Sequence, residues 1–170
     1  MSEHTAVSVR VAFVPTFRFR YGDWARTMHE KSVATLRDIK GLDLVELPGA
    51  PGAAMDTPTP GGAVHTLDEA ERAVEILRAA AVDALIICPL DFGDERSVAK
   101  VAEQLDVPAL LYATREPPAS TGDSLARVSD SYCGNLSIAT ALHRRELPFR
   151  FAGLFFPDEP ALAREIERFV

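Results

Sequence analysis

Residues 84–112 read ALIICPLDFGDERSVAKVAEQLDVPALLY, and this stretch decides the fold. It opens with an apolar run over residues 84–88 and closes with a second one over residues 107–112. Between the two runs lies a segment with apolar residues at helical spacing, and Asp94, a residue type that caps helices, stands just before it. Strands that are joined through a helix run parallel. The stretch therefore predicts a parallel strand–helix–strand unit.

The same alternation continues on both sides of this unit. Five apolar strands that alternate with helices predict an α/β fold, with a doubly wound parallel five-stranded sheet and helices on both faces. We expect the flavodoxin-like strand order 2-1-3-4-5; a Rossmann-like three-layer sandwich is the alternative, because periodicity does not separate the two orders. The other strands are expected at residues 7–15, 42–47 and 151–156, and the other helices at 23–40, from 66, at 130–145 and from 158.

Local signals mark several helix ends. Thr66 followed by Glu69 three residues later is a capping-box pattern, which predicts a helix start. Gly41 is predicted to cap the end of the first helix. His29 and His143 fall on predicted helices and are expected at the surface.

Composition limits the class of protein. The chain has 170 residues, with 18 Lys and Arg against 25 Asp and Glu, for a net charge of −7. This length suits one domain, residues 1–170. The negative charge predicts no nucleic-acid or membrane partner, and no apolar run is long enough to span a bilayer. The start of the chain carries no signal-peptide pattern, and two cysteines make no disulfide framework. We therefore expect a cytoplasmic protein with reduced thiols.

The C-terminus carries an apolar helical stripe of Leu162, Ile166, Phe169 and Val170 that has no stop signal after it. This pattern predicts that the chain was cut from a longer protein; a short helix that frays at its end is the alternative. Two long loops, residues 48–62 and 114–129, interrupt the regular alternation. The first is rich in Pro and Gly and is interpreted as an interdomain linker or a binding loop.

Ligands of open parallel sheets bind at the carboxyl ends of the strands. The first strand is followed by Arg18, Arg20, Tyr21 and Trp24, without a phosphate-binding glycine motif. Arginine donors beside aromatic rings suit a polyhydroxylated or anionic small molecule. The alternative is a set of solvated arginines with Trp24 facing the core.

The third strand is followed by Asp91, Asp94 and Glu95, whose carboxylates could hold a metal or a sugar hydroxyl. Asp94 and Glu95 are also explained by the start of the next helix. His65 is open to three interpretations, a ligand, an acid/base group or an ordinary loop residue. Neither a catalytic residue nor a metal site is predicted within this chain.

The segment from Ser129 to Asn135 collects small polar groups at the start of a predicted helix. It could bind hydroxyl or carboxylate groups, or Ser129 or Asp130 could simply cap the helix.

Four stretches in order, residues 82–95, 107–118, 129–134 and 148–153, resemble the L-fucose/L-arabinose isomerase family. The similarity covers most of the chain but only the N-terminal α/β domain of those enzymes. None of the stretches alone is a catalytic signature, so the resemblance rests on their order and combination.

The resemblance implies a metal-dependent aldose–ketose isomerase, which uses Mn²⁺ in its full-length form. The family's metal-binding Glu, Asp and His lie in later domains, and no residue of this chain matches them. The chain would then be an inactive substrate-side and assembly domain that binds a sugar at a neighbouring subunit of a homo-oligomer. The best-placed residues for that role are Arg18, Arg20, Tyr21 and Trp24, with Asp91, Arg115, Ser129 and Asp130 as weaker candidates.

Two other functions remain open at this point. The chain could be a stand-alone sugar-binding or regulatory module that uses the same strand-end crevice. It could also be a purely structural assembly domain whose exposed helix faces join subunits.

Overall fold

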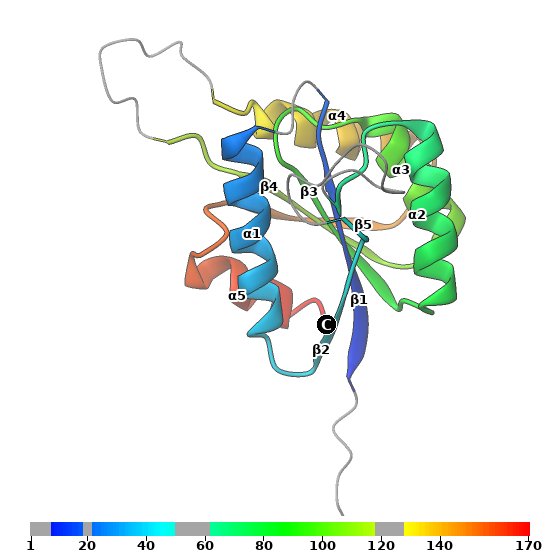
Figure 1. Cartoon of the computed structure of the whole chain (residues 1–170), viewed down its shortest axis with the longest axis horizontal. Helices are drawn as coiled ribbons and strands as arrows, with labels where there is room; N and C mark the ends of the chain where they lie inside the picture. The colour runs from blue at the N-terminus through cyan, green and yellow to red at the C-terminus, as the bar shows by residue number, and fades with distance from the viewer. Residues whose placement is uncertain (1–7, 19–21, 50–61, 118–127) are drawn as a thin grey trace, which may run out of the picture.

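A computed structural model describes residues 8–18, 22–49, 62–117 and 128–170 (Figure 1). Its five strands form one sheet in the order β2-β1-β3-β4-β5, and all four strand pairs are parallel. The predicted α/β class and the 2-1-3-4-5 order are confirmed. The strands are β1 (Val9–Thr16), β2 (Leu42–Glu46), β3 (Ala84–Pro89), β4 (Ala109–Thr114) and β5 (Phe149–Phe155); the helices are α1 (Asp23–Arg37), α2 (Leu67–Ala79), α3 (Glu95–Leu105), α4 (Ser131–Arg144) and α5 (Pro160–Glu167).

The helices cover the two faces of the sheet, as predicted. In Figure 1, α1 and α5 lie on one face, while α2, α3 and α4 lie on the other. Each face has its own hydrophobic core, and the side chains of β1, β3 and β4 alternate between the two cores. Every residue of β3 and β4 is buried, because strands in the middle of a parallel sheet are covered on both faces.

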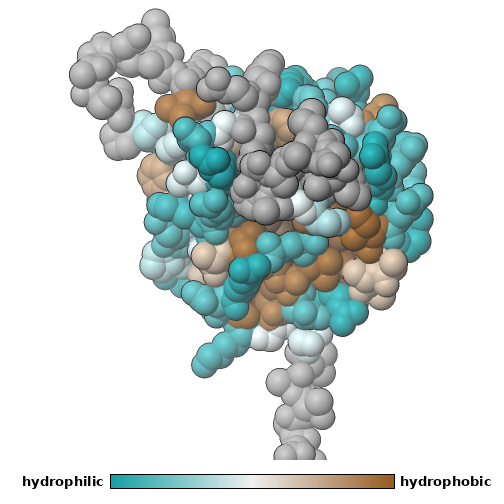
Figure 2. All heavy atoms as spheres, in the orientation of Figure 1, coloured by the Kyte–Doolittle hydropathy of each residue, from teal (hydrophilic) through white to brown (hydrophobic). Residues whose placement is uncertain are grey.

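The edge strands are less covered. The apolar residues of β2 are only half-buried, and Phe151 of β5 is 40% exposed. In Figure 2, brown apolar surface appears near the middle of the molecule, where Figure 1 draws β2. Teal hydrophilic side chains cover most of the surrounding surface in that view.

Two predicted helix starts are confirmed. The Thr66 side chain accepts a hydrogen bond from the Glu69 N–H, and the Glu69 carboxylate accepts one from the Thr66 N–H, which completes the capping box of α2. The Asp94 side chain caps α3 by accepting the Ser97 N–H at 2.8 Å.

Two predictions about α1 are wrong. The helix ends at Arg37, and Gly41 takes its left-handed φ of 81° in the turn before β2 rather than at the cap, which is Asp38. His29 is 4% exposed rather than at the surface, because it lies on the same side of α1 as the buried Met28 and Val33 and contacts the Phe13 ring edge-on.

The stripe near the C-terminus packs against the sheet. Leu162 and Ile166 of α5 are buried in the core on the α1 side, and Phe169 and Val170 pack against that core. Most of the loop at residues 48–62 and part of the loop at 114–129 lie outside the described residues. Among the helices that are described, none has the length and apolar character needed to cross a membrane.

Candidate functional site

Two pockets open at the carboxyl edge of the sheet. The first, which we call the His65 pocket, has a volume of about 660 Å³ and lies between the starts of α2 and α3. The second, the Trp24 pocket, has a volume of about 370 Å³ and lies between the start of α1 and the segment before α4. The His65 pocket is lined by Arg18, His65, Thr66, Leu67, Asp94, Glu95 and Arg96, and the Trp24 pocket by Gly22, Asp23, Trp24, Ala25, Leu90, Asp91, Val128 and Ser129.

The topology explains why the pockets form here. β1 and β3 are neighbours in the sheet, but the chain leaves β1 toward α1 on one face and leaves β3 toward α3 on the other. The two connections diverge at this switch point and leave a crevice, which is where ligands bind in open α/β sheets.

Asp91 lines the Trp24 pocket and is hydrogen-bonded to the backbone of Arg18, which lines the His65 pocket. Its Oδ1 accepts hydrogen bonds from the backbone N–H of Arg18 and from that of Gly93, each at 2.8 Å. The side chain is largely buried and ties the loop after β3 to the loop after β1. Thr16 adds a second tie, because its hydroxyl accepts the Asp94 N–H at 2.9 Å.

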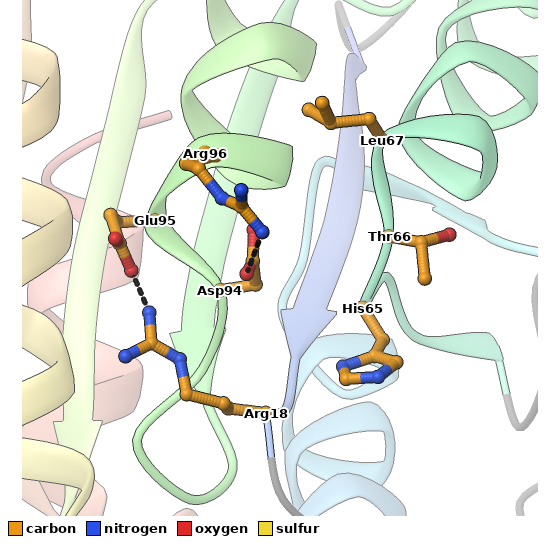
Figure 3. A pocket seen from close by; sticks show the side chains of 7 residues that line it. All are labelled: Arg18, His65, Thr66, Leu67, Asp94, Glu95 and Arg96. Carbon is orange, nitrogen blue, oxygen red and sulfur yellow. Dashed lines mark hydrogen bonds and ion pairs between the residues drawn. The ribbon is translucent and has the colours of Figure 1, made fainter.

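Figure 3 shows the side chains that line the His65 pocket, and two of them, His65 and Arg18, lie against aromatic rings. The His65 ring stacks on Phe17 with centroids 4.8 Å apart, and its Nδ1 lies 3.1 Å from the Phe17 carbonyl oxygen. On the opposite side, the Arg18 guanidinium lies 4.5 Å above the Phe92 ring and forms an ion pair with Glu95.

The hydrogen bond of His65 determines its tautomer. A carbonyl oxygen only accepts, so Nδ1 must carry the proton, and in the neutral imidazole Nε2 then holds a lone pair. His65 therefore presents a hydrogen-bond acceptor, while Arg18 presents donors.

Asp94 keeps its negative charge inside this pocket. Burial raises the pKa of its carboxyl group, but hydrogen bonds from the N–H and hydroxyl of Ser97, together with the nearby Arg96 and Arg18, lower the pKa overall. Arg96 lies 3.6 Å from the second carboxylate oxygen. The Asp94 carboxylate thus caps α3, which is the structural alternative given for it in the sequence analysis.

The Trp24 pocket is shaped by an indole ring and carboxylates. Trp24 packs partly into the core on the α1 side, and its Nε1 is buried without a hydrogen-bond partner among the residues that the structure describes. Asp23 and Asp91 are the charged groups in the lining, and the lining includes no described cation.

Glu116 organises the segment before α4, and sequence reasoning missed it. Its carboxylate accepts the N–H of Val128 at 2.8 Å, the hydroxyl of Ser129 at 2.7 Å and the N–H of Asp130 at 2.7 Å. Partial burial raises its pKa, but these hydrogen bonds lower it below the ordinary 4.5 overall. These donors and the Ser129 N–H, which bonds to the same carboxylate at 3.1 Å, follow 12 to 14 residues later, so no local sequence pattern signals the contact.

The same segment defines the start of α4. Asp130 is the N-cap residue, with a left-handed φ of 59° and no side-chain cap hydrogen bond. The Ser129 hydroxyl oxygen accepts the Ser131 N–H at 3.3 Å. Of the two candidates for capping this helix, only Ser129 therefore uses its side chain.

The predicted site residues are divided between different places. Arg18 lines the His65 pocket, whereas Trp24, Asp91 and Ser129 line the Trp24 pocket. Asp130 adjoins Ser129 without lining that pocket. Arg115 points toward β5 and α5, donating to the Leu154 carbonyl at 3.0 Å and pairing with Glu159 at 3.4 Å. Arg20 and Tyr21 lie outside the described residues.

The described residues do not fit the metal that the resemblance implies. Within residues 8–18, 22–49, 62–117 and 128–170, no group of three or more His, Cys, Asp or Glu side chains is placed to hold a metal ion. Cys88 is also unsuited to nucleophilic chemistry, because complete burial raises the pKa of its thiol to about 12 despite an opposing hydrogen bond with Tyr112.

The sequence of residues 29–170, which is most of the chain, matches the family model of the fucose/sulfoquinovose isomerase N-terminal domain. The chain belongs to this family. The resemblance identified from the sequence is thereby confirmed, and the carboxyl-edge pockets described above are features of a fucose/sulfoquinovose isomerase N-terminal domain. A search of curated proteins finds no match.

Two solved structures are distantly similar to this fucose/sulfoquinovose isomerase N-terminal domain. One is an ABC-transporter periplasmic solute-binding protein from Actinobacillus succinogenes with bound D-allose, at 13% identity and a TM-score of 0.36. The other is a galactofuranose-binding protein, at 11% identity and a TM-score of 0.36. The matches cover 87% and 85% of this chain but only 59% and 56% of the two structures, so the chain spans just over half their length.

Proposed function

We propose that this chain is the substrate-side and assembly domain of a cytoplasmic, metal-dependent aldose–ketose isomerase. The observation that carries the proposal is the family match over residues 29–170. The Trp24 pocket supports it, because an indole face can pack against the C–H face of a sugar ring while Asp91 and Ser129 offer oxygen atoms to hydroxyl groups. Arg18, Arg20 and Tyr21 belong to the same connection after β1.

In this proposal, the metal that polarises the sugar oxygens is bound by residues that this chain does not supply. Manganese would stabilise the negative charge that develops as the proton moves between adjacent carbons. The described residues of this chain bind and orient the sugar and shield it from water, within a homo-oligomer in which the domain lies beside a neighbouring subunit's active site.

The test is an assay of the purified 170-residue chain with Mn²⁺ and L-fucose, L-arabinose or sulfoquinovose. We expect no interconversion of aldose and ketose. Turnover that depends on this chain would overturn the proposal, because it would place the catalytic groups within residues 1–170.

A stand-alone sugar-binding or regulatory module is the second candidate. The observation in its favour is that the Trp24 pocket, with a volume of about 370 Å³, is lined by an indole ring together with the Asp91 carboxylate and the Ser129 hydroxyl. Trp24 is the only tryptophan in the sequence, so its fluorescence reports directly on that pocket. Saturable quenching by a pentose or deoxyhexose, lost on Asp91→Asn, would favour the module; no response to any sugar would favour the domain that needs a partner.

A further inference from the structure

We propose that the His65 pocket is a second ligand site, separate from the Trp24 pocket, and that it binds an uncharged polyhydroxylated molecule through His65, Arg18 and Glu95. Neither pocket shares a lining residue with the other.

The first argument is that the polar groups are already held in place. His65 has a stacked ring beneath it and one nitrogen fixed by a carbonyl, while Arg18 has the Phe92 ring beneath it and a carboxylate beside it. Exposed side chains normally lose rotamer freedom when they bind a ligand, so groups that are fixed beforehand bind more tightly. On an ordinary solvated surface we would not expect two polar side chains that line one cavity each to be fixed by an aromatic ring.

The second argument concerns which kind of ligand fits. Neighbouring hydroxyl groups need both donors and acceptors, and the pocket provides an acceptor at His65 Nε2, an acceptor at Glu95 and donors at Arg18. The first turns of α2 and α3 both reach the lining. The pocket therefore presents both hydrogen-bond donors and hydrogen-bond acceptors to a ligand.

The third argument excludes an anion as the preferred ligand. The lining contains two arginines and two ionisable carboxyl groups, and the formal charges of Arg18, Arg96, Asp94 and Glu95 cancel. Asp94 stays ionised, since hydrogen bonds and nearby arginines outweigh the effect of burial on its pKa. An anion would meet these carboxylates, whereas a neutral polyol would not be repelled. The volume of about 660 Å³ also lies within the range of about 300–1,000 Å³ that small-molecule sites occupy.

The test uses the whole 170-residue chain and two-dimensional NMR of backbone amides and histidine side-chain nitrogens. L-fucose, L-arabinose and inorganic sulfate are the probes. We expect the free chain to show His65 as the Nδ1–H tautomer, and at least one of the two sugars to shift the Leu67, Glu95 and His65 signals saturably. Sulfate is expected to cause no comparable shift.

Two variants separate this site from the Trp24 pocket. His65→Asn keeps a donor near the position of Nδ1 but removes Nε2, and we expect it to weaken sugar binding at this pocket about tenfold, the loss that corresponds to one hydrogen bond. Trp24→Phe is the matched control and should leave the shifts at Leu67 and Glu95 unchanged. Glu95→Gln, at a half-buried position in the first turn of α3, provides the same test if His65→Asn does not fold.

Each other outcome overturns the proposal. Absence of shifts with both sugars would mean that the pocket takes no polyol. Undiminished affinity in both His65→Asn and Glu95→Gln would show that these two side chains do not bind the ligand. Tighter binding of sulfate than of either sugar would identify an anion site. This proposal is tested independently of the isomerase assignment. Its measurement is the NMR signals of His65, Leu67 and Glu95, whereas the proposed function is tested by turnover and by Trp24 fluorescence.

Discussion

The two pockets at the carboxyl edge differ in how their walls are supported. The His65 pocket is built from the first turns of two helices and from side chains that rest on aromatic rings. The Trp24 pocket is built from the start of one helix and from a segment that Glu116 holds in place. The two sides of one crevice are therefore stabilised in different ways. Regular secondary structure positions the His65 pocket, whereas one wall of the Trp24 pocket depends on the Glu116 carboxylate.

The largest effect is expected at Gly134, where α4 passes directly against the loop that carries Phe92. A Cβ at Gly134 would lie 1.7 Å from the Phe92 carbonyl oxygen, a backbone atom that has no room to move. We expect Gly134→Ala to lower the free energy of unfolding by more than about 3 kcal/mol, although alanine favours a helix, and to disturb both pockets together. Urea denaturation measures the loss.

Ser137→Ala is the control for Gly134, because Ser137 lies on the same helix and is only half-buried. It should change stability by less than about 0.5 kcal/mol. A Gly134→Ala protein as stable as the parent would show that α4 does not approach the Phe92 loop closely.

Acid should act next, through the helix that carries Trp24. Burial lowers the pKa of His29 to about 4, whereas an unfolded histidine has a pKa of about 6.5. Between these values the unfolded chain binds a proton that the folded chain does not, so stability falls as the pH falls. We expect a loss of about 1.4 kcal/mol per pH unit below pH 6.5, which is about 2 kcal/mol at pH 5.

Urea titrations at a series of pH values measure this slope. His29→Gln should flatten it between pH 6.5 and 5, whereas His143→Gln, at an exposed histidine, should leave it unchanged. An unaltered slope in His29→Gln would show that another group causes the acid sensitivity.

The smallest effect is expected from Glu116→Gln, and it should distinguish the pockets most clearly. The amide cannot replace an ionised carboxylate that accepts four donors, but the site is partly solvated, so we expect a loss of about 1 kcal/mol. Hydrogen exchange should quicken at Val128, Ser129 and Asp130 and stay unchanged at Leu67 and Glu95.

The same contact should weaken in acid in the parent protein. Because the folded pKa of Glu116 is below 4.5, its stabilisation is complete above that pH and is lost as the pH falls through the lowered pKa. Glu75→Gln, at an exposed position of α2, is the control for Glu116→Gln and should leave the exchange rates at residues 128–130 unchanged. Equal exchange rates at residues 128–130 in Glu116→Gln and in the parent protein would contradict the assigned role.

The sequence was sufficient for features that depend on local pattern. The strand–helix alternation, the capping box at Thr66 and the Asp94 cap were all predicted, because these signals act within a few positions of the chain. The expected strand order is confirmed, but the local pattern did not separate it from the Rossmann-like alternative. His29 was misplaced because a polar residue was assigned to the surface, although it shares the helical spacing of Ala25, Ser32 and Leu36.

The site was less predictable, because it depends on contacts between distant residues. Arg18 and Trp24 are close in sequence, yet they line different pockets. The starts of α2 and α3 face each other only once the sheet has formed, so the role of His65 could not be seen from its neighbours. Glu116 likewise meets its donors across a long loop. The roles of Arg115, Ser129 and Asp130 in sugar binding stay predictions.

The burial of Cys88 makes thiol chemistry on this molecule selective. Its sulfur is fully enclosed and its pKa is raised to about 12, so alkylating reagents at neutral pH find almost no thiolate there. The second cysteine, Cys133, is half-buried in the first turn of α4, one residue before the close contact of Gly134 with the Phe92 loop. A spectroscopic label can therefore be attached at one natural position, close to the segment before α4 that lines the Trp24 pocket, without removing any cysteine.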